Sequence, residues 1–212
     1  MNRTIIALLL CAATASSGWA HRARHTASAS AKSDWRQIVT SADRDRLSNW
    51  RTAWTAAFAK ARTAGKGPLI AAQGALFDPD RALPDGATPP PGRYRCRVFK
   101  IGANGPAMQD FTFYPAVDCQ IDDEGGMSRL YKIAGPQRPF GLVFKDTPAR
   151  SVFLGTLMLG DETKPMNYGQ DTSRDMAGFV ERIGVRRWRL MLPSPRFESL
   201  LDVVELTPAP AK

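Results

Sequence analysis

Six arginines in two short runs are the most distinctive charged groups of this chain, and five of them share faces with one another. The runs read Arg93-Tyr94-Arg95-Cys96-Arg97 and Val185-Arg186-Arg187-Trp188-Arg189-Leu190. Alternate side chains of an extended strand share a face, so Arg93, Arg95 and Arg97 lie together, and so do Arg187 and Arg189. Guanidinium groups bind phosphate, sulfate and carboxylate through paired hydrogen bonds. If the two rows face outward on neighbouring strands, they predict an anion- or partner-binding surface; the simpler alternative is that outward arginines keep a sheet soluble.

Catalytic chemistry has few candidate residues. Both histidines, His21 and His25, precede the region that has folding signals, so an imidazole general base is missing from that region. The usual nucleophile, zinc and phosphate-loop motifs are missing too, and we predict no catalytic residue. Glycan hydrolysis by two carboxyl groups is the enzymatic alternative, and Glu181, in the apolar segment 178–183, is its candidate acid. The competing interpretation makes Glu181 an outward residue opposite arginines.

Metal and cofactor chemistry are not expected either. The acidic turns at 78–85 and 118–124 lack the ligand spacing of a calcium loop, so we predict no metal and no cofactor.

Of the three cysteines, Cys11 falls in an apolar leader, which leaves Cys96 and Cys119. We predict a disulfide between them, closing a loop of about 24 residues with a stabilisation of about 3 kcal/mol. Two buried free thiols are the alternative.

The first 20 residues have the pattern of a secretory signal. Arg3 precedes the apolar run 5–13, and Gly18-Trp19-Ala20 suits cleavage near Ala20. We therefore expect a periplasmic or secreted protein, with residues 21–33 as a flexible spacer. A lipid anchor on Cys11 is the alternative, although Leu10 is too large for the usual motif. No later run approaches 18 apolar residues, so no transmembrane span is expected.

The remaining chain divides into a helical part and a strand-rich part. Residues 34–91 carry an amphipathic helix over 34–64, with Leu47, Trp50, Trp54 and Phe58 on one face, then a short helix over 68–77 and a linker. Residues 92–208 carry alternating segments and tight turns, and 209–212 form a tail. The strands after the one at residue 93 are expected at about 110–114, 116–121, 127–133, 140–145, 151–154, 176–183, 185–192 and 200–206.

These segments predict a mainly β fold. About eight short strands without alternating helices indicate an antiparallel β-barrel, up-and-down or lipocalin-like, with the amphipathic N-terminal helix packed on it as one domain. A sandwich is the alternative.

The net charge is +9, and loss of Arg3 with the leader lowers it to +8. An anionic envelope component suits an exported basic protein, whereas nucleic acid is not expected, because no recognition motif is present. We expect a monomer.

Several short motifs, among them Gly135-Pro136-Gln137-Arg138 and Asp175-Met176-Ala177-Gly178, together resemble an uncharacterised family of exported bacterial proteins, a domain-of-unknown-function family. The resemblance covers most of 34–208 and implies a single domain, but it brings no activity. A looser likeness, carried by Gly92-Arg93-Tyr94-Arg95-Cys96 and Cys119, connects the chain to small secreted barrels that inhibit metalloproteases. The family motifs are Pro91–Arg97, Gly135-Pro136-Gln137-Arg138 with Gly141, Phe153-Leu154-Gly155, Asp175-Met176-Ala177-Gly178, Trp188–Pro193 and Val204-Glu205-Leu206.

Our hypothesis is an exported, non-enzymatic β-barrel that binds an anionic envelope ligand or another envelope protein through the two arginine rows. A secreted protease-inhibitor-like barrel and a carboxylate-dependent glycan hydrolase are the alternatives.

Overall fold

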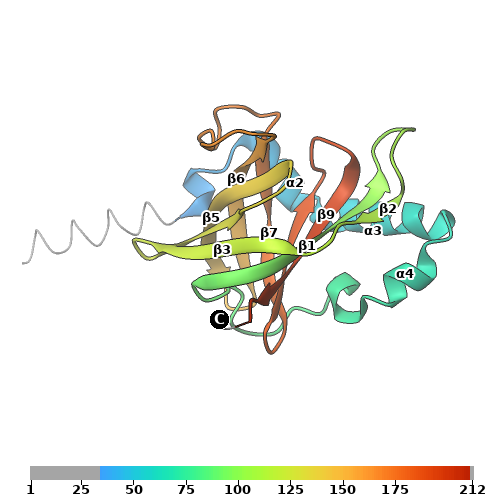
Figure 1. The fold of residues 1–212 in the computed structure, drawn as a ribbon, viewed down its shortest axis with the longest axis horizontal. Helices are drawn as coiled ribbons and strands as arrows, with labels where there is room; N and C mark the ends of the chain where they lie inside the picture. The colour runs from blue at the N-terminus through green and yellow to red at the C-terminus, as the bar shows by residue number, and fades with distance from the viewer. Residues whose placement is uncertain (1–33, 211–212) are drawn as a thin grey trace, which may run out of the picture. The chain divides into compact units, whose positions relative to one another are not determined.

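The computed structural model describes residues 34–210, which begin with short helices and continue as a long antiparallel sheet (Figure 1). The expected signal segment 1–20 and spacer 21–33 lie outside the described residues, as do the last two positions of the expected tail. Among residues 34–210, no helix is long and apolar enough to cross a bilayer. The helical elements are η1 (Trp35–Gln37), α2 (Ser41–Ser48), α3 (Trp50–Thr63), α4 (Gly67–Ala71) and η2 (Gly74–Phe77).

Eight of the nine strands close into an antiparallel β-barrel. Each strand from β3 to β8 pairs with the next one along the chain, and β1 pairs with both β3 and β9. The predicted barrel with a packed helix is therefore confirmed, and β2 is an extra strand on β1. The strands are β1 (Gly92–Ala103), β2 (Phe111–Phe113), β3 (Val117–Glu124), β4 (Met127–Lys132), β5 (Gln137–Thr147), β6 (Arg150–Leu159), β7 (Asp175–Gly184), β8 (Arg187–Pro193) and β9 (Ser199–Pro208).

The helical segment is broken where the sequence predicts one continuous helix over 34–64. Thr40 caps α2, because its side chain accepts a hydrogen bond from the backbone N–H of Asp43. The chain bends at Asn49, α3 then runs to Thr63, and Gly65 follows with a φ of +74°, a conformation that favours glycine. The apolar face of α3 packs on β1, β8 and β9, and α2 packs on β7, so both helices cover one side of the barrel (Figure 1).

The barrel wall separates two apolar cores. Inward-facing side chains such as Phe153 and Leu190 fill the interior. Outward-facing side chains such as Phe99 and Val203 meet Trp54 of α3 beneath the helices. Alternate residues of the covered strands therefore enter different cores, and both faces of that part of the sheet are buried.

Two glycines allow β5 and β6 to approach each other closely. Gly141 lies opposite Gly155 in the strand register. A Cβ atom on Gly141 would lie 2.4 Å from the carbonyl oxygen of Leu154, and one on Gly155 would lie 2.3 Å from that of Phe140. The ring of Phe153 occupies the space that both Cβ atoms would need. The pair therefore sets the local shape of the barrel.

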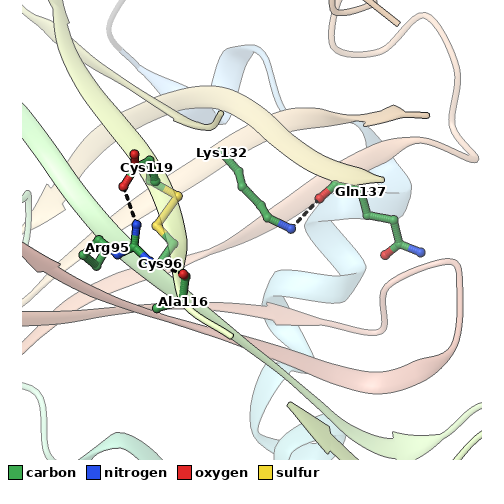
Figure 2. Close-up of a disulfide and its surroundings, with 7 residues drawn as sticks. Arg95, Cys96, Ala116, Cys119, Lys132 and Gln137 are labelled. Carbon is green, nitrogen blue, oxygen red and sulfur yellow. Dashed lines mark hydrogen bonds and ion pairs between the residues drawn. A yellow bond between two sulfur atoms is a disulfide. The ribbon is translucent and has the colours of Figure 1, made fainter. Parts of the chain in front are cut away.

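The predicted disulfide joins Cys96 of β1 to Cys119 of β3, and it is confirmed (Figure 2). Their Cα atoms lie 5.8 Å apart, within the usual range for a disulfide. Both side chains point into the barrel and are buried. The bond therefore lies inside the interior core and links two adjacent strands at the start of the barrel.

Candidate ligand-binding site

The two predicted arginine rows do not lie on neighbouring strands. Strand β9 runs between β1 and β8 and places Glu205 opposite both Arg97 and Arg189. The two oxygens of the Glu205 carboxylate accept hydrogen bonds from Arg97, at 3.0 Å, and from Arg187, at 2.6 Å. The two expected rows are therefore not adjacent. Instead, the Glu205 carboxylate on β9 bridges an arginine of β1 and an arginine of β8.

Arg93 and Arg95 are paired as well. Both donate to the carboxylate of Asp118 on β3, at 3.2 and 2.6 Å, and Arg95 also donates to the carbonyl oxygen of Ala116 (Figure 2). The two guanidinium groups hold the pKa of Asp118 below its ordinary value, mainly through the hydrogen bond from Arg95. Anion binding by these five arginines stays a prediction, but each of them already has a carboxylate partner.

Arg189 is fully buried, although its position on β8 faces outward as expected. Its guanidinium group donates to one carboxylate oxygen of Glu181, at 2.7 and 2.9 Å, and to the carbonyl oxygens of Leu76 and Asp78. Arg150 donates to the other oxygen of Glu181. The outward position is covered because α3 and η2 pack over this part of the sheet, and the Arg189 guanidinium lies 5.1 Å from the Trp54 ring.

Glu181, the candidate acid of the glycan-hydrolase alternative, is itself fully buried. Both oxygens are engaged by arginines, and the residue lies on the helix-covered face rather than in the barrel interior. This arrangement anchors the helical layer to the barrel.

A cavity of about 160 Å³ opens at one end of the barrel. The loops after β4, β6 and β8 surround its mouth, and Lys100 and Asp202 project inward from the facing strands β1 and β9. The opposite end is closed by Tyr94 and Trp188, which pack edge to face and donate hydrogen bonds to carbonyl oxygens of the linker after η2. The wall of the cavity on the side of the barrel interior is apolar and includes Val98, Leu157, Met176, Leu192 and Val204.

Lys100 forms ion pairs with two carboxylates in this cavity. Its ammonium group lies 3.0 Å from the carboxylate of Asp202 and 3.1 Å from that of Glu198. Burial alone would lower the pKa of Lys100, but the two carboxylates together raise it, so the amine stays protonated at neutral pH. Ser199 donates a further hydrogen bond to Asp202. The charge of Lys100 is therefore neutralised within the protein.

The charge of Lys132, the other lysine of the cavity, is not neutralised in this way. Its amine donates one hydrogen bond, of 2.9 Å, to the backbone carbonyl oxygen of Gln137 (Figure 2). Within residues 34–210, no carboxylate oxygen lies within ion-pair distance of it. Burial lowers the pKa of Lys132, and the positive charges of Lys100 and Arg138 lower it further, against a weaker opposing effect from Asp202. The cavity thus holds one amine whose charge the protein does not balance.

The family of the chain follows from a family-model match over residues 35–206, which spans both the helical layer and the barrel. The chain belongs to the family described as Domain of unknown function (DUF4893). This confirms the resemblance to an uncharacterised domain family. No curated protein and no solved structure matches the chain.

The mouth of the DUF4893 cavity adds further positive charge. Five cationic and three acidic side chains line the cavity. Arg196 and Phe197 are exposed on the loop after β8, and Tyr114 lies across from them. Arg174, on the loop after β6, is held by Glu162 and Asp171. A cationic rim above an apolar wall matches a ligand that carries an anionic end and a hydrocarbon part.

Sequence reasoning missed the cavity lysines of the DUF4893 domain. A signal for Lys100 existed, because it continues the inward alternation of Tyr94, Cys96 and Val98. A charged residue at an inward position is unusual unless it is paired or functional. The position of Lys132 depends on how β4 meets β5, and no local pattern indicates it.

Proposed function

We propose that the DUF4893 barrel binds a small amphipathic anion in the cavity at its open end, and that this is its function rather than catalysis. The observation that carries the proposal is the Lys132 amine, which faces an apolar-walled cavity without a carboxylate partner among the described residues. A buried charge without a partner is costly, and a bound anion would remove that cost. The anionic ligand of an exported protein remains the chemistry we expect, but at a different place from the arginine rows.

The dimensions of the cavity favour a short ligand. A volume of about 160 Å³ is close to that of an apolar protein cavity that takes up a six-carbon molecule such as benzene. A ligand of this size could place a carboxylate at Lys132 and a chain of about five carbons against Leu157 and Val204. It would then contact both the cationic and the apolar parts of the cavity. Transfer of the chain out of water would contribute about 0.8 kcal/mol for each buried CH₂ group.

The test compares hexanoate with 1-hexanol, which has a similar hydrocarbon chain and no charge, by calorimetry at low salt. We expect hexanoate to bind and Lys132→Met to weaken it by at least about tenfold, because a charge-assisted hydrogen bond is lost. The matched control is Lys145→Met, on the exposed face of β5, which should leave the affinity unchanged. Equal affinities for acid and alcohol, or an unaffected Lys132→Met variant, would contradict the proposal.

A second variant separates this cavity from the arginine rows. Arg93→Gln with Arg95→Gln removes two guanidinium groups on the barrel exterior and leaves the cavity intact. We expect normal hexanoate binding by this variant. If it loses binding while Lys132→Met keeps it, the anion site is the arginine face.

The source of the anion is tested with the same variants. The cavity is small, so a free carboxylate is expected to bind in preference to vesicles of anionic lipid. Recovery of the protein on such vesicles, with Lys132→Met reducing it, would instead indicate that the anionic end belongs to a lipid headgroup. Protease inhibition, which depends on the tail from His21, stays a prediction outside the described residues.

A further inference from the structure

We propose that the ε-amino group of Lys132 reacts reversibly with an aldehyde in this cavity to form an imine, with Lys100 as the proton donor. The proposal rests on the proposed function in that the aldehyde enters the same cavity, its hydrocarbon part on the same apolar wall. It goes beyond that function, because the ligand becomes covalently attached through a carbonyl group.

The position of Lys132 suits a nucleophile. Its side chain is half-buried and lines the cavity, and the nitrogen is fixed by one hydrogen bond to the Gln137 carbonyl oxygen. The turn between β4 and β5 leaves room for the amine at Gly135, where a Cβ would lie 3.1 Å from the nitrogen. A held amine next to an apolar wall meets an incoming carbonyl group without first breaking an ion pair.

The environment of Lys132 lowers its pKa, so the neutral, reactive form is more accessible than in an exposed lysine, while the protonated form still binds an anion. Lys100 and Arg138 are the nearest cations to act on it, while Asp202, the acidic group that acts on it, is already bound to Lys100. Arg138 is occupied by the carbonyl oxygens of Gly135, Gly160 and Glu162. Desolvation and nearby positive charge are the two environments that make a lysine nucleophilic.

Lys100 has the opposite environment. Asp202 and Glu198 keep it charged, so the cavity contains one amine that loses its proton easily and one that retains it. Because both amines line the same cavity, the protonated Lys100 is placed to serve as the acid and the Lys132 amine as the nucleophile. In the reaction, the neutral Lys132 nitrogen forms a bond to the carbonyl carbon as the C=O π bond opens, and one of the two nitrogen protons passes to the oxygen to give a carbinolamine. Protonation of its hydroxyl by Lys100 then allows water to leave, and the nitrogen proton returns to Lys100. One aldehyde and one amine give one imine and one water, with no oxidation or reduction.

The experiment traps the imine. The full chain is incubated with hexanal and cyanoborohydride, which reduces an imine to a stable secondary amine, and peptide mapping locates the added hexyl group. We expect Lys132 to be modified at least about tenfold faster than the exposed Lys145, because its amine is held by the Gln137 carbonyl oxygen beside an apolar wall that binds the hexyl chain. Hexanoate should compete with the reaction, and Lys100→Met should slow it. Equal rates of modification at Lys132 and Lys145 would overturn the proposal.

A conservative variant separates this inference from the proposed function. Lys132→Arg keeps a cation in the cavity but removes the nucleophilic amine. We expect it to lose the hexyl adduct at position 132, and a cooperative urea-unfolding transition like that of the wild-type protein shows that it folds. Hexanoate binding by the unmodified protein without selective trapping at Lys132 would refute only the imine. Selective trapping without hexanoate binding would refute only the anion-binding function.

Discussion

Replacement of Arg189 by methionine should detach the helical layer from the barrel. Methionine replaces the apolar stem of arginine but has no donors, so Glu181 would keep only Arg150, and the carbonyl oxygens of Leu76 and Asp78 would lose the guanidinium group. Removal of one partner of a buried ion pair costs about 3–5 kcal/mol. For a domain of this size, 1 kcal/mol corresponds to about 2–4 °C, so the Tm should fall by about 6–20 °C.

Urea unfolding followed by tryptophan fluorescence measures this loss directly, because Trp50 and Trp54 lie on the helix that Arg189 holds. Amide exchange should accelerate first in α3. The matched control is Arg187→Met, two residues earlier on the same strand. Arg187 is half-buried and its partner Glu205 keeps Arg97, so we expect a loss of at most about 1 kcal/mol.

The comparison of these two variants decides the interpretation. If Arg189→Met lowers the free energy of unfolding no more than Arg187→Met does, the buried ion pairs contribute little and apolar packing alone holds the helices. If Arg189→Met binds hexanoate normally, the helical anchor and the cavity are independent.

Three further outcomes are expected. Replacement of both Cys96 and Cys119 by alanine should lower the free energy of unfolding in urea by about 3 kcal/mol, and no change between oxidised and reduced wild-type protein would contradict this. Gly141→Ala should cost about 3 kcal/mol or more in thermal unfolding, because its Cβ would meet backbone atoms, whereas Gly67→Ala, in a helix with open space, should be neutral or stabilising. Hexanoate affinity should fall as pH rises toward 10.5, the ordinary pKa of lysine, because binding needs protonated Lys132 and burial lowers its pKa in the free protein. Calorimetry across this range checks it, and an affinity that rises with pH would refute the role of that charge.

The barrel could be predicted because its signals are local. Alternation in segments such as the one from Tyr94 to Val98 reflects which face of a strand is apolar, and a closed sheet follows from many such segments without long helices. The disulfide followed from counting, since Cys96 and Cys119 are the cysteines that remain after the leader. The apolar stripe of α3 was likewise visible in the spacing of Trp54 and Phe58.

The site depended on contacts between distant residues. Arg189 was placed correctly on the outer face of its strand, but exposure of that face depends on whether another element covers it, and η2 lies more than 100 positions earlier in the chain. The cavity required Lys132 and Asp202 to meet in one interior, which depends on register and closure rather than on local pattern. Charged residues at inward positions were the available signal.

The closing pair of strands also determines when the protein can acquire its structure during synthesis. Strand β1 pairs with β9, about 100 residues later, from Tyr94 opposite Pro208 to Ala103 opposite Ser199. Until β9 has been synthesised, the backbone hydrogen-bonding groups at the free edges of both β1 and β8 are therefore exposed. A strand of another chain can pair with either edge. Because β9 also carries Asp202 and Glu205, the cavity and the arginine bridges form together with closure, in the last step.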